Sequence, residues 1–336
     1  MISVRLRAEL AQSARIVVRQ AHRGIPPIAT KSPDREEEFV ASLVIGGVQD
    51  LAASWRPLLA RAGVSVRIGG VFIHKRPFVR FPAPLGSGRL ASNAKRCELG
   101  DLLLVHEHLG ARNASRRAVL IQAKMRWNKV DPIQDKLYRS WPNFRLEPRT
   151  LKPNLTRIIS PNDAGSRYGF ISSHKALSSR PWILSSPASP NANKALFTVD
   201  LGLYLAELLW ASDHPQPRHQ RGRSAWPPNS SSWSILIDDL LSESHLKRFT
   251  LRSLFGSSKP YRSVFSEITL GSGRLLPLFF GGDDSSFGAI IEAPADRDFA
   301  IISINEGDDW PPGEIEGEIA EGSGGISTLL VQTRSE

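Results

Sequence analysis

Two apolar stretches near the middle of the chain have the pattern of neighbouring strands in a sheet. Residues 99–106 and 117–125 are mostly apolar, and the polar segment between them contains Gly110, Asn113 and Ser115. These residue types favour turn conformations, so the two stretches are predicted to form a β-hairpin. A strand with little polar alternation is typical of the centre of a sheet that is covered on both faces.

Three polar residues interrupt the apolar pattern of this hairpin. Asp101 lies near the start of the first strand, and Gln122 and Lys124 lie at the end of the second. Successive side chains of a strand point to opposite faces, so Gln122 and Lys124 share a face and can meet Asp101 across the pair. A buried carboxylate or ammonium is costly unless it is paired or holds a metal ion. These residues are therefore candidates for a functional site.

An Asp after Gly at the start of one strand, followed by Gln-Ala-Lys at the end of the next, resembles the PD-(D/E)XK nuclease superfamily. The closest resemblance is to its restriction-endonuclease-like, Mrr-type branch, in which Gln replaces the second acid. Residues 131–144 and 167–174 resemble the helix and the strand that follow the hairpin in this family, and the similarity spans residues 34–175. The chain departs from the family pattern at Gly100, where the family name has Pro, and at Gln122, which lacks the charge of an acid.

The resemblance implies an α/β (α+β) fold with a restriction-endonuclease-like core, in which helices flank a central mixed sheet, and a C-terminal α+β region follows. With the composition, it predicts a basic N-terminal arm and linker (1–31), a nuclease-like domain (32–180) and a C-terminal region with an acidic end (181–336). Inside the nuclease-like domain, alternating apolar residues predict one or two strands in 64–81. A helix is predicted at 132–140, with Asp131 as its cap.

The activity implied by the resemblance is that of an Mg²⁺-dependent endonuclease that hydrolyses phosphodiester bonds of DNA, in restriction, phage defence or repair. The implied catalytic residues are Asp101, Gln122, Lys124 and Glu38. The implied metal ligands are Asp101, Gln122, Glu38 and the backbone carbonyl of Ala123. These are hard oxygen donors, which Mg²⁺ prefers, and Mn²⁺ is the alternative ion. Lys124 is expected beside the attacking water and the phosphate.

Glu38 and Glu98 are two further acids that could contribute to this site. A helix is predicted to begin near Asp34 and Glu37, which have capping-box spacing, and to run to about residue 62 with a bend at 46–47. The resemblance places a Glu of this helix at the edge of the metal site, and Glu38 is the candidate because Glu37 serves the cap. The alternative is that the acids only stabilise the helix through their favourable interaction with the positive end of its dipole. Glu98 is expected in a supporting position, since alternation points it to the opposite face from Asp101.

The charge of the chain is unevenly distributed. Its net charge is +10, but residues 1–160 contain 28 Lys and Arg against 12 Asp and Glu. A basic half is the electrostatic footprint of a polyanion, so DNA is the expected partner, RNA is the alternative, and a merely basic surface is the third reading. A homodimer or a partner protein is also compatible. The side chains expected to contact nucleic acid are Lys75, Arg76, Arg126, Lys129 and Gln134.

The end of the chain has the opposite charge. Residues 281–336 contain 13 Asp and Glu against 2 Lys and Arg. This stretch could compete with phosphates for the basic surface, although an acidic surface that only aids solubility is the simpler expectation. Short strands are predicted at 261–280, 289–292, 299–305 and 326–332, and helices at 198–210 and 234–254.

The remaining signals limit the classes of protein. The single cysteine, Cys97, excludes an internal disulfide and is expected to be a small buried residue. No apolar run reaches the ~20 residues of a membrane-spanning helix, so no membrane association and a cytoplasmic location are expected. The alternative to an enzyme is a catalytically weak nuclease-fold module that binds nucleic acid or a partner protein within a larger complex.

Two groups of residues have both a structural and a functional interpretation. Residues 1–24 are predicted to form a basic amphipathic helix, an arm that lies on the domain or on DNA; an organelle transit peptide is the alternative. The aromatic residues Tyr138, Trp141 and Phe144 could form a platform for stacked bases, but their spacing favours a place in the core.

Overall fold

A computed structural model shows an α+β fold. It describes residues 3–23, 36–71, 77–81, 96–109, 114–125, 130–147, 155–160, 165–173, 178–187, 198–209, 222–227, 230–246 and 326–335. The predicted strands at 261–280, 289–292 and 299–305 lie outside these ranges. Within them, no helix is both long and apolar enough to cross a membrane.

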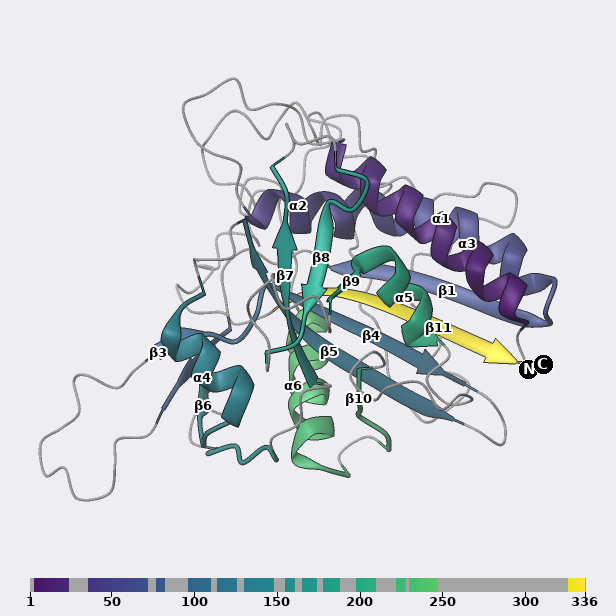
Figure 1. The fold of residues 1–336 in the computed structure, drawn as a ribbon. Coiled ribbons are helices and arrows are strands. Elements are labelled where there is room, and N and C mark those ends of the chain that lie inside the picture. The colour runs from purple at the N-terminus through teal and green to yellow at the C-terminus, as the bar shows by residue number, and fades with distance from the viewer. Residues whose placement is uncertain are drawn as a thin grey trace, which may run out of the picture.

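The central sheet is mixed and has eight strands (Figure 1). Its order is β1 (Val64–Val71), β11 (Ser327–Ser335), β4 (Leu102–His108), β5 (Ser115–Lys124), β7 (Ser166–Ile171), β8 (Trp182–Ser185) and β9 (Thr198–Asp200), and β10 (Arg223–Ser224) also pairs with β5. β11 runs parallel to β4 and β5 runs parallel to β7, whereas the other neighbours are antiparallel. A smaller antiparallel sheet contains β3 (Arg96–Glu98), β2 (Phe78–Arg80) and β6 (Arg145–Glu147) in that order.

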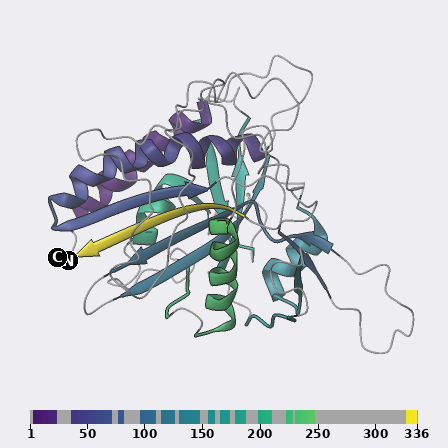
Figure 2. The ribbon, with the colours of Figure 1, turned by 180° about the vertical axis from the view of Figure 1, so that it is seen from behind.

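Helices and the small sheet cover the two faces of the central sheet (Figures 1 and 2). One face packs against α1 (Val4–Arg23), α2 (Glu36–Ser42), the π-helix η1 (Leu43–Gly47), α3 (Val48–Ala60) and α5 (Leu201–Leu209). The other face packs against α4 (Pro132–Ser140), α6 (Ser232–Leu246) and the small sheet. The mixed sheet flanked by helices agrees with the coarse fold class expected from the sequence.

The predicted hairpin is formed by β4 and β5. Their register pairs Leu102 with Ile121 and His108 with Ser115. Side chains alternate between two buried clusters: Leu102 and Ile121 pack under the α1–α3 layer, whereas Leu103 packs on the side of α4 and α6. This is the arrangement that the nearly continuous apolar pattern predicted for central strands.

The helix predicted from residue 34 to about 62 is interrupted rather than continuous. α2 ends at Ser42, five residues form a π-helix that includes Gly46 and Gly47, and α3 then begins at Val48. The predicted bend therefore corresponds to a π-helical segment, a common way for a helix to change its path.

The N-terminal helix α1 is part of the packed structure, one of the two places considered for the arm. A Cβ atom at Gly202 of α5 would lie 2.5 Å from the backbone nitrogen of Arg15, so α1 and α5 approach backbone to backbone. Arg15 also forms an ion pair with Asp200 (2.8 Å), and Arg7 pairs with Glu207. Apolar burial and ion pairs of α1 thus anchor it beside the sheet.

The end of the chain lies inside the central sheet. β11 contains the predicted strand 326–332 and inserts between β1 and β4. Because β8, β9 and β11 follow residue 180 and belong to the same sheet as β4 and β5, the expected domain boundary at 180 falls within one sheet.

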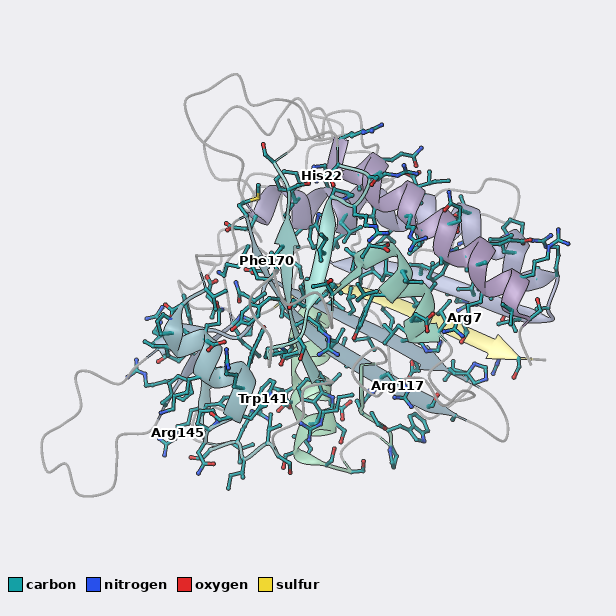
Figure 3. The ribbon with its side chains drawn as sticks, in the orientation of Figure 1. Arg7, His22, Arg117, Trp141, Arg145 and Phe170 are labelled. Atoms are coloured by element: carbon teal, nitrogen blue, oxygen red, sulfur yellow. The ribbon has the colours of Figure 1, made fainter. Side chains whose placement is uncertain are left out.

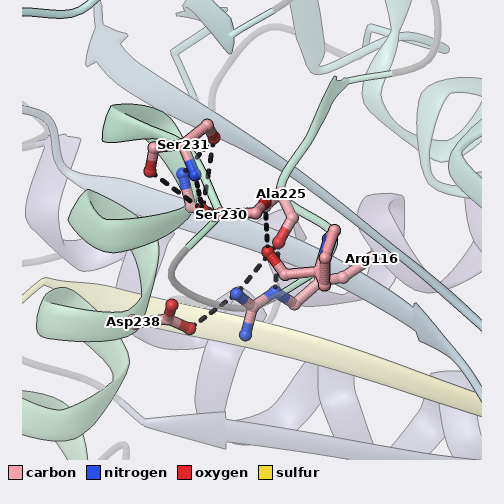
Figure 4. A network of polar contacts seen from close by, with 7 residues as sticks. Arg116, Ala225, Ser230, Ser231 and Asp238 are labelled. Carbon is pink, nitrogen blue, oxygen red and sulfur yellow. Dashed lines mark hydrogen bonds and ion pairs between the residues drawn. The ribbon is translucent and has the colours of Figure 1, made fainter.

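A buried polar network joins the hairpin to α6 (Figure 4). Arg116 of β5 is fully buried, and its guanidinium donates to the carbonyl oxygen of Ala225 (3.0 and 3.2 Å) and pairs with Asp238 of α6 (2.5 Å). A buried arginine is tolerated only when its charge is paired, so this contact ties β5 to one relative position of α6.

Candidate active site

The candidate site lies where β4 begins and β5 ends. The backbone nitrogen of Asp101 donates to the carbonyl oxygen of Ile121 (2.9 Å), although the ladder pairs Ile121 with the next residue, Leu102. Two residues of one strand thus oppose one of the other, which is a bulge-like arrangement that redirects side chains. Asp101 Oδ2 accepts hydrogen bonds from the backbone nitrogen of Ala123 (2.7 Å) and from Gln122 Nε2.

The backbone of Ala123 also faces Asp101. The N–H and C=O groups of one strand residue point to the same side, and the N–H of Ala123 donates to Asp101. Its carbonyl oxygen is therefore directed to the same side, beyond the Leu102–Ile121 pair that opens the β4–β5 ladder. The structure thus brings Asp101 together with Gln122 and the backbone of Ala123.

The orientation of the Gln122 amide follows from a chain of hydrogen bonds that begins at a backbone carbonyl. Gln134 Nε2 donates to the carbonyl oxygen of Glu98 (3.1 Å), which can only accept. The same Nε2 donates to Gln122 Oε1, so Gln122 turns its Nε2 toward Asp101. Both glutamines are almost completely buried. Gln122 is therefore a hydrogen-bond donor to Asp101, and its oxygen is not directed to a metal ion as expected from the sequence.

Helix α4 places Gln134 where its side chain can bind both Gln122 and the carbonyl oxygen of Glu98. The helix begins as predicted, with the Asp131 side chain accepting from the backbone nitrogens of Ile133 (2.6 Å) and Gln134 (3.2 Å) and with Pro132 in the first turn. Gln134 was expected to contact nucleic acid. Its burial under Gln122 leaves it a positioning contact instead, because the exposed fraction of the residue is 3%.

Tyr138, one turn after Gln134, explains the glycine that precedes Asp101. Its hydroxyl donates to the carbonyl oxygen of Leu99 (2.8 Å), and a Cβ atom at Gly100 would lie 3.0 Å from that hydroxyl. A side chain at residue 100 would push against Tyr138 and against the backbone of Ile121, 3.3 Å away. Packing against Tyr138 and Ile121 thus accounts for a glycine at this position.

Electrostatics make Asp101 the most perturbed carboxyl of the site. Burial raises its pKa from 3.8 to about 8, and the nearby charges of Glu98 and Glu36 act in the same direction. The Lys124 ammonium and the hydrogen bond from Ala123 lower the pKa of Asp101, but they do not cancel the other effects. Lys124 therefore lies close enough for its charge to act on Asp101, as the strand pattern predicted. Perturbed carboxyls of this kind cluster at functional sites.

Helix α2 contributes Glu36 rather than Glu38, the acid expected from the sequence. Glu36 Oε1 accepts from the backbone nitrogen of Met125 (3.0 Å), directly after Lys124. Glu38 belongs to α2, but its side chain lies outside what the structure describes. The sequence did not indicate Glu36, because three consecutive acids at the start of a helix have the same local pattern. Only the fold decides which of them reaches the strand.

Glu98 lies close enough to Asp101 for its charge to act on that carboxyl. Residues 96–98 form β3 of the small sheet, whereas β4 of the central sheet begins at Leu102. The alternation argument assumed one continuous strand and therefore does not apply across the three residues between them. The charge of Glu98 raises the pKa of Asp101, so its carboxylate lies within electrostatic reach of Asp101.

Other predicted residues have simpler outcomes. Lys75, Arg76, Arg126 and Lys129 lie outside the described residues. Cys97 is buried as expected, and burial raises the pKa of its thiol to about 12, which excludes an easily formed thiolate. The aromatic residues after Gln134 belong to the core, as the spacing favoured: Trp141 packs against Tyr138 and, edge to face, against Trp233 of α6.

The site has oxygen donors of the kind that a hard divalent cation prefers. Among the described residues, no three His, Cys, Asp or Glu side chains are grouped closely enough to hold an ion by themselves. Mg²⁺ commonly uses one or two carboxylates and keeps water and substrate oxygens as its other ligands. Burial and, to a smaller extent, the charges of Glu98 and Glu36 raise the pKa of Asp101, so a bound cation would favour its ionised form. Asp101 and the Ala123 carbonyl fit this role, and the Gln122 oxygen does not.

Comparison with known proteins adds no identification: no protein-family description, curated protein or solved structure matches the chain.

Proposed function

We propose that this protein is a metal-dependent nuclease that hydrolyses phosphodiester bonds of DNA, with a restriction-endonuclease-like core of the PD-(D/E)XK type. The observation that carries the proposal is the meeting of Asp101 with Gln122 and Ala123, beside Lys124, at the ends of two antiparallel strands. The strand pattern of the sequence predicts the same residues as one site. The basic first half of the chain supports a polyanionic substrate.

Asp101 and the Ala123 carbonyl would hold the divalent cation, and Glu36 or Glu98 would contact it directly or through water. When bound, such a cation supplies positive charge beside the phosphate and makes water easier to deprotonate near neutral pH. The Gln122 N–H donates to Asp101 Oδ2, as does the N–H of Ala123, so one carboxylate oxygen is fixed and the other is left for the cation.

Lys124 acts on the substrate in this proposal. Hydrolysis adds water across a P–O bond, and negative charge builds on the phosphate oxygens as the new bond forms. The ammonium of Lys124 donates hydrogen bonds to a phosphate oxygen or to the attacking water and offsets that charge. Asp101 would bind the cation, whereas Lys124 would contact the phosphate. Because these roles are separate, both residues should be required for cleavage.

The test is cleavage of plasmid and linear duplex DNA in Mg²⁺ by the wild-type protein and by Asp101→Ala and Lys124→Ala. We expect each variant to lose at least about a hundredfold in rate, because removing one preorganised charge from such a site typically costs this much. Asp50→Ala and Arg61→Ala change exposed residues of α3 and the turn after it and serve as controls that should cut at the wild-type rate. Cleavage by Asp101→Ala or Lys124→Ala at the wild-type rate would refute the assignment.

A second function is favoured by the orientation of Gln122. Its oxygen is occupied by Gln134, so the site lacks one of the ligands expected from the sequence. A protein with this arrangement could bind DNA without cutting it, as a module of a larger complex. Wild-type protein that binds duplex DNA but shows no cleavage in either Mg²⁺ or Mn²⁺ would support this second function over the first.

A further inference from the structure

The small sheet carries three arginines in one row. Its register places Arg80 of β2 directly opposite Arg96 of β3 on one side and Arg145 of β6 on the other. All three side chains are exposed. Like charges directly opposite each other on neighbouring strands are destabilising, and here two such pairs share Arg80. A row of this kind needs a counter-charge, which the protein or a ligand must supply.

Within the part of the chain that the structure describes, only part of that counter-charge is present. Glu147 pairs with Arg80 (2.5 Å) and more distantly with Arg96 (3.6 Å), so one carboxylate serves two guanidinium groups. Arg145 donates to the hydroxyl of Thr156 (3.2 Å), which is neutral. Arg96 is held over the ring of Phe78, 3.9 Å from its centroid, a contact that orders a guanidinium without neutralising it. The row is therefore ordered but carries excess positive charge.

The exposed face of the small sheet carries the three arginines together with Glu98. Val79, Cys97 and Leu146 point to the buried cluster under α4, so their strand neighbours point outward. Glu98 is on this outward face with Arg96, and its charge acts on Asp101. Figure 3 shows Arg145 on the outer side of the small sheet, away from the central strands.

The distances set by the chain are short on the scale of a DNA duplex. Arg96 and Asp101 are five positions apart in the chain, so their Cα atoms lie at most about 18 Å apart, within the ~34 Å of one helical turn of DNA. Across the sheet, two strand spacings of ~4.8 Å separate the outer arginines, so the row extends over ~10 Å. A DNA backbone bound along the row would therefore lie within one helical turn of Asp101.

We propose that this face, the arginine row Arg96–Arg80–Arg145, binds the phosphate backbone of duplex DNA and holds it against the candidate site. The inference rests on the proposed function, since it supplies the substrate contact for that site. Arginine suits the role because its planar guanidinium binds phosphate through two hydrogen bonds and remains charged. The row was not among the nucleic-acid contacts expected from the sequence. Lys75 and Arg76, which were, precede β2 directly in the chain.

The experiment measures binding of the full-length protein to a fluorescent DNA duplex of mixed sequence in EDTA, which prevents cleavage, at several salt concentrations. The triple variant Arg80→Gln/Arg96→Gln/Arg145→Gln should bind at least about tenfold more weakly at low salt and should reduce the slope of log K against log salt by two to three. The matched control, Arg5→Gln/Arg23→Gln/Arg61→Gln, removes the same charge from exposed arginines of α1 and the end of α3 and should leave binding nearly unchanged.

Two further variants separate phosphate binding from a structural role. Replacing the same three arginines with Lys keeps the charge and should retain most of the salt slope. Glu147→Gln removes the carboxylate that competes for Arg80 and Arg96 and should tighten binding several-fold at low salt. Thermal unfolding of every variant checks folding. An equal loss in the row and control variants, or no tightening in Glu147→Gln, would overturn the assignment.

The outcomes distinguish this inference from the proposed function. If the row variant binds duplex DNA as the wild type does, while wild-type protein cuts DNA in Mg²⁺, the inference fails and the nuclease stands. If the row is required for binding but no cleavage occurs, the inference stands and the nuclease fails. A preference for duplex RNA or single strands over duplex DNA in the same assay would overturn the choice of duplex DNA as the ligand.

Discussion

The raised pKa of Asp101 predicts an unusual pH dependence of stability. We consider Asp101→Asn in the absence of divalent cations. Asparagine keeps an oxygen that can accept from Ala123 and Gln122, but it does not ionise. The wild-type carboxyl has a pKa of 3.8 when unfolded and about 8 when folded, so between these values the folded state holds a proton that the unfolded state has lost. The free energy of unfolding of the wild type should therefore fall as pH rises through this window.

The size of the effect follows from the same values. One pKa unit is worth about 1.36 kcal/mol, so a rise from 3.8 to about 8 sets an upper limit of about 6 kcal/mol. Asp101 is only partly buried, and solvent screens part of the interaction. We expect Asp101→Asn to match the wild type near pH 4 and to be more stable by about 2–3 kcal/mol above pH 8.

Urea unfolding at pH 4, 6 and 9 in EDTA measures this difference, provided that the denaturant slope stays the same. Glu9→Gln is a control of opposite sign. Hydrogen bonds from Arg5 and Arg61 lower the pKa of Glu9, so its contribution to stability is present above its unfolded pKa and is lost as pH falls. Parallel pH profiles for the wild type and Asp101→Asn would refute the reasoning about Asp101. Added Mg²⁺ at pH 9 should stabilise the wild type and not Asp101→Asn, since a ligand of the folded state raises its stability.

Two further predictions concern charge at the site and in the acidic stretch. Gln122→Glu should lower the Mg²⁺ concentration needed for half-maximal cleavage, because Gln134 would still bind one oxygen of the new carboxylate while the other oxygen faces Asp101 and adds negative charge. An unchanged Mg²⁺ requirement would contradict this prediction. Complete loss of activity would show that the Gln122 N–H is needed. Residues 283–318 contain 11 Asp and Glu and one Arg, so their deletion raises the net charge from +10 to +20. The deletion should tighten non-specific DNA binding in EDTA more at low salt than at high salt, because the competing effect is electrostatic. Equal affinity of the deleted and full-length proteins at low salt would exclude such competition.

The hairpin and α4 could be predicted because local signals decide them. The apolar runs define β4 and β5, and the cap at Asp131 with Pro132 fixes where α4 begins. The meeting of Asp101 with Gln122 followed from strand pairing alone. What the sequence did not contain is the amide orientation, since a glutamine looks the same as a donor or as a ligand. That orientation depends on Gln134 and on a backbone carbonyl of β3, a segment of another sheet.

Long-range pairing limited the rest of the prediction. Glu98 belongs to the small sheet, whereas Asp101 directly precedes a strand of the central sheet. The alternation of side chains between two faces therefore does not continue from Glu98 to Asp101. The position of β11 depends on contacts with β1 and β4, which lie more than two hundred residues earlier. No local pattern distinguishes a strand at the centre of this sheet from one in a separate domain.

The place of β11 changes how the acidic stretch should be understood. Ser327 pairs with Leu102, and the side chain of Ile326 would lie 3.5 Å from a Cβ atom at Gly100, so the chain enters the central sheet next to Asp101. The stretch that precedes β11 is therefore anchored at both ends of its sequence, by α6 and by β11, and is not a free tail. At a screening length of ~8 Å, acids of this stretch act on the site only where they approach it closely. Truncation near residue 307 would remove β11 and expose β1 and β4 to solvent, which is why only an internal deletion isolates the effect of charge.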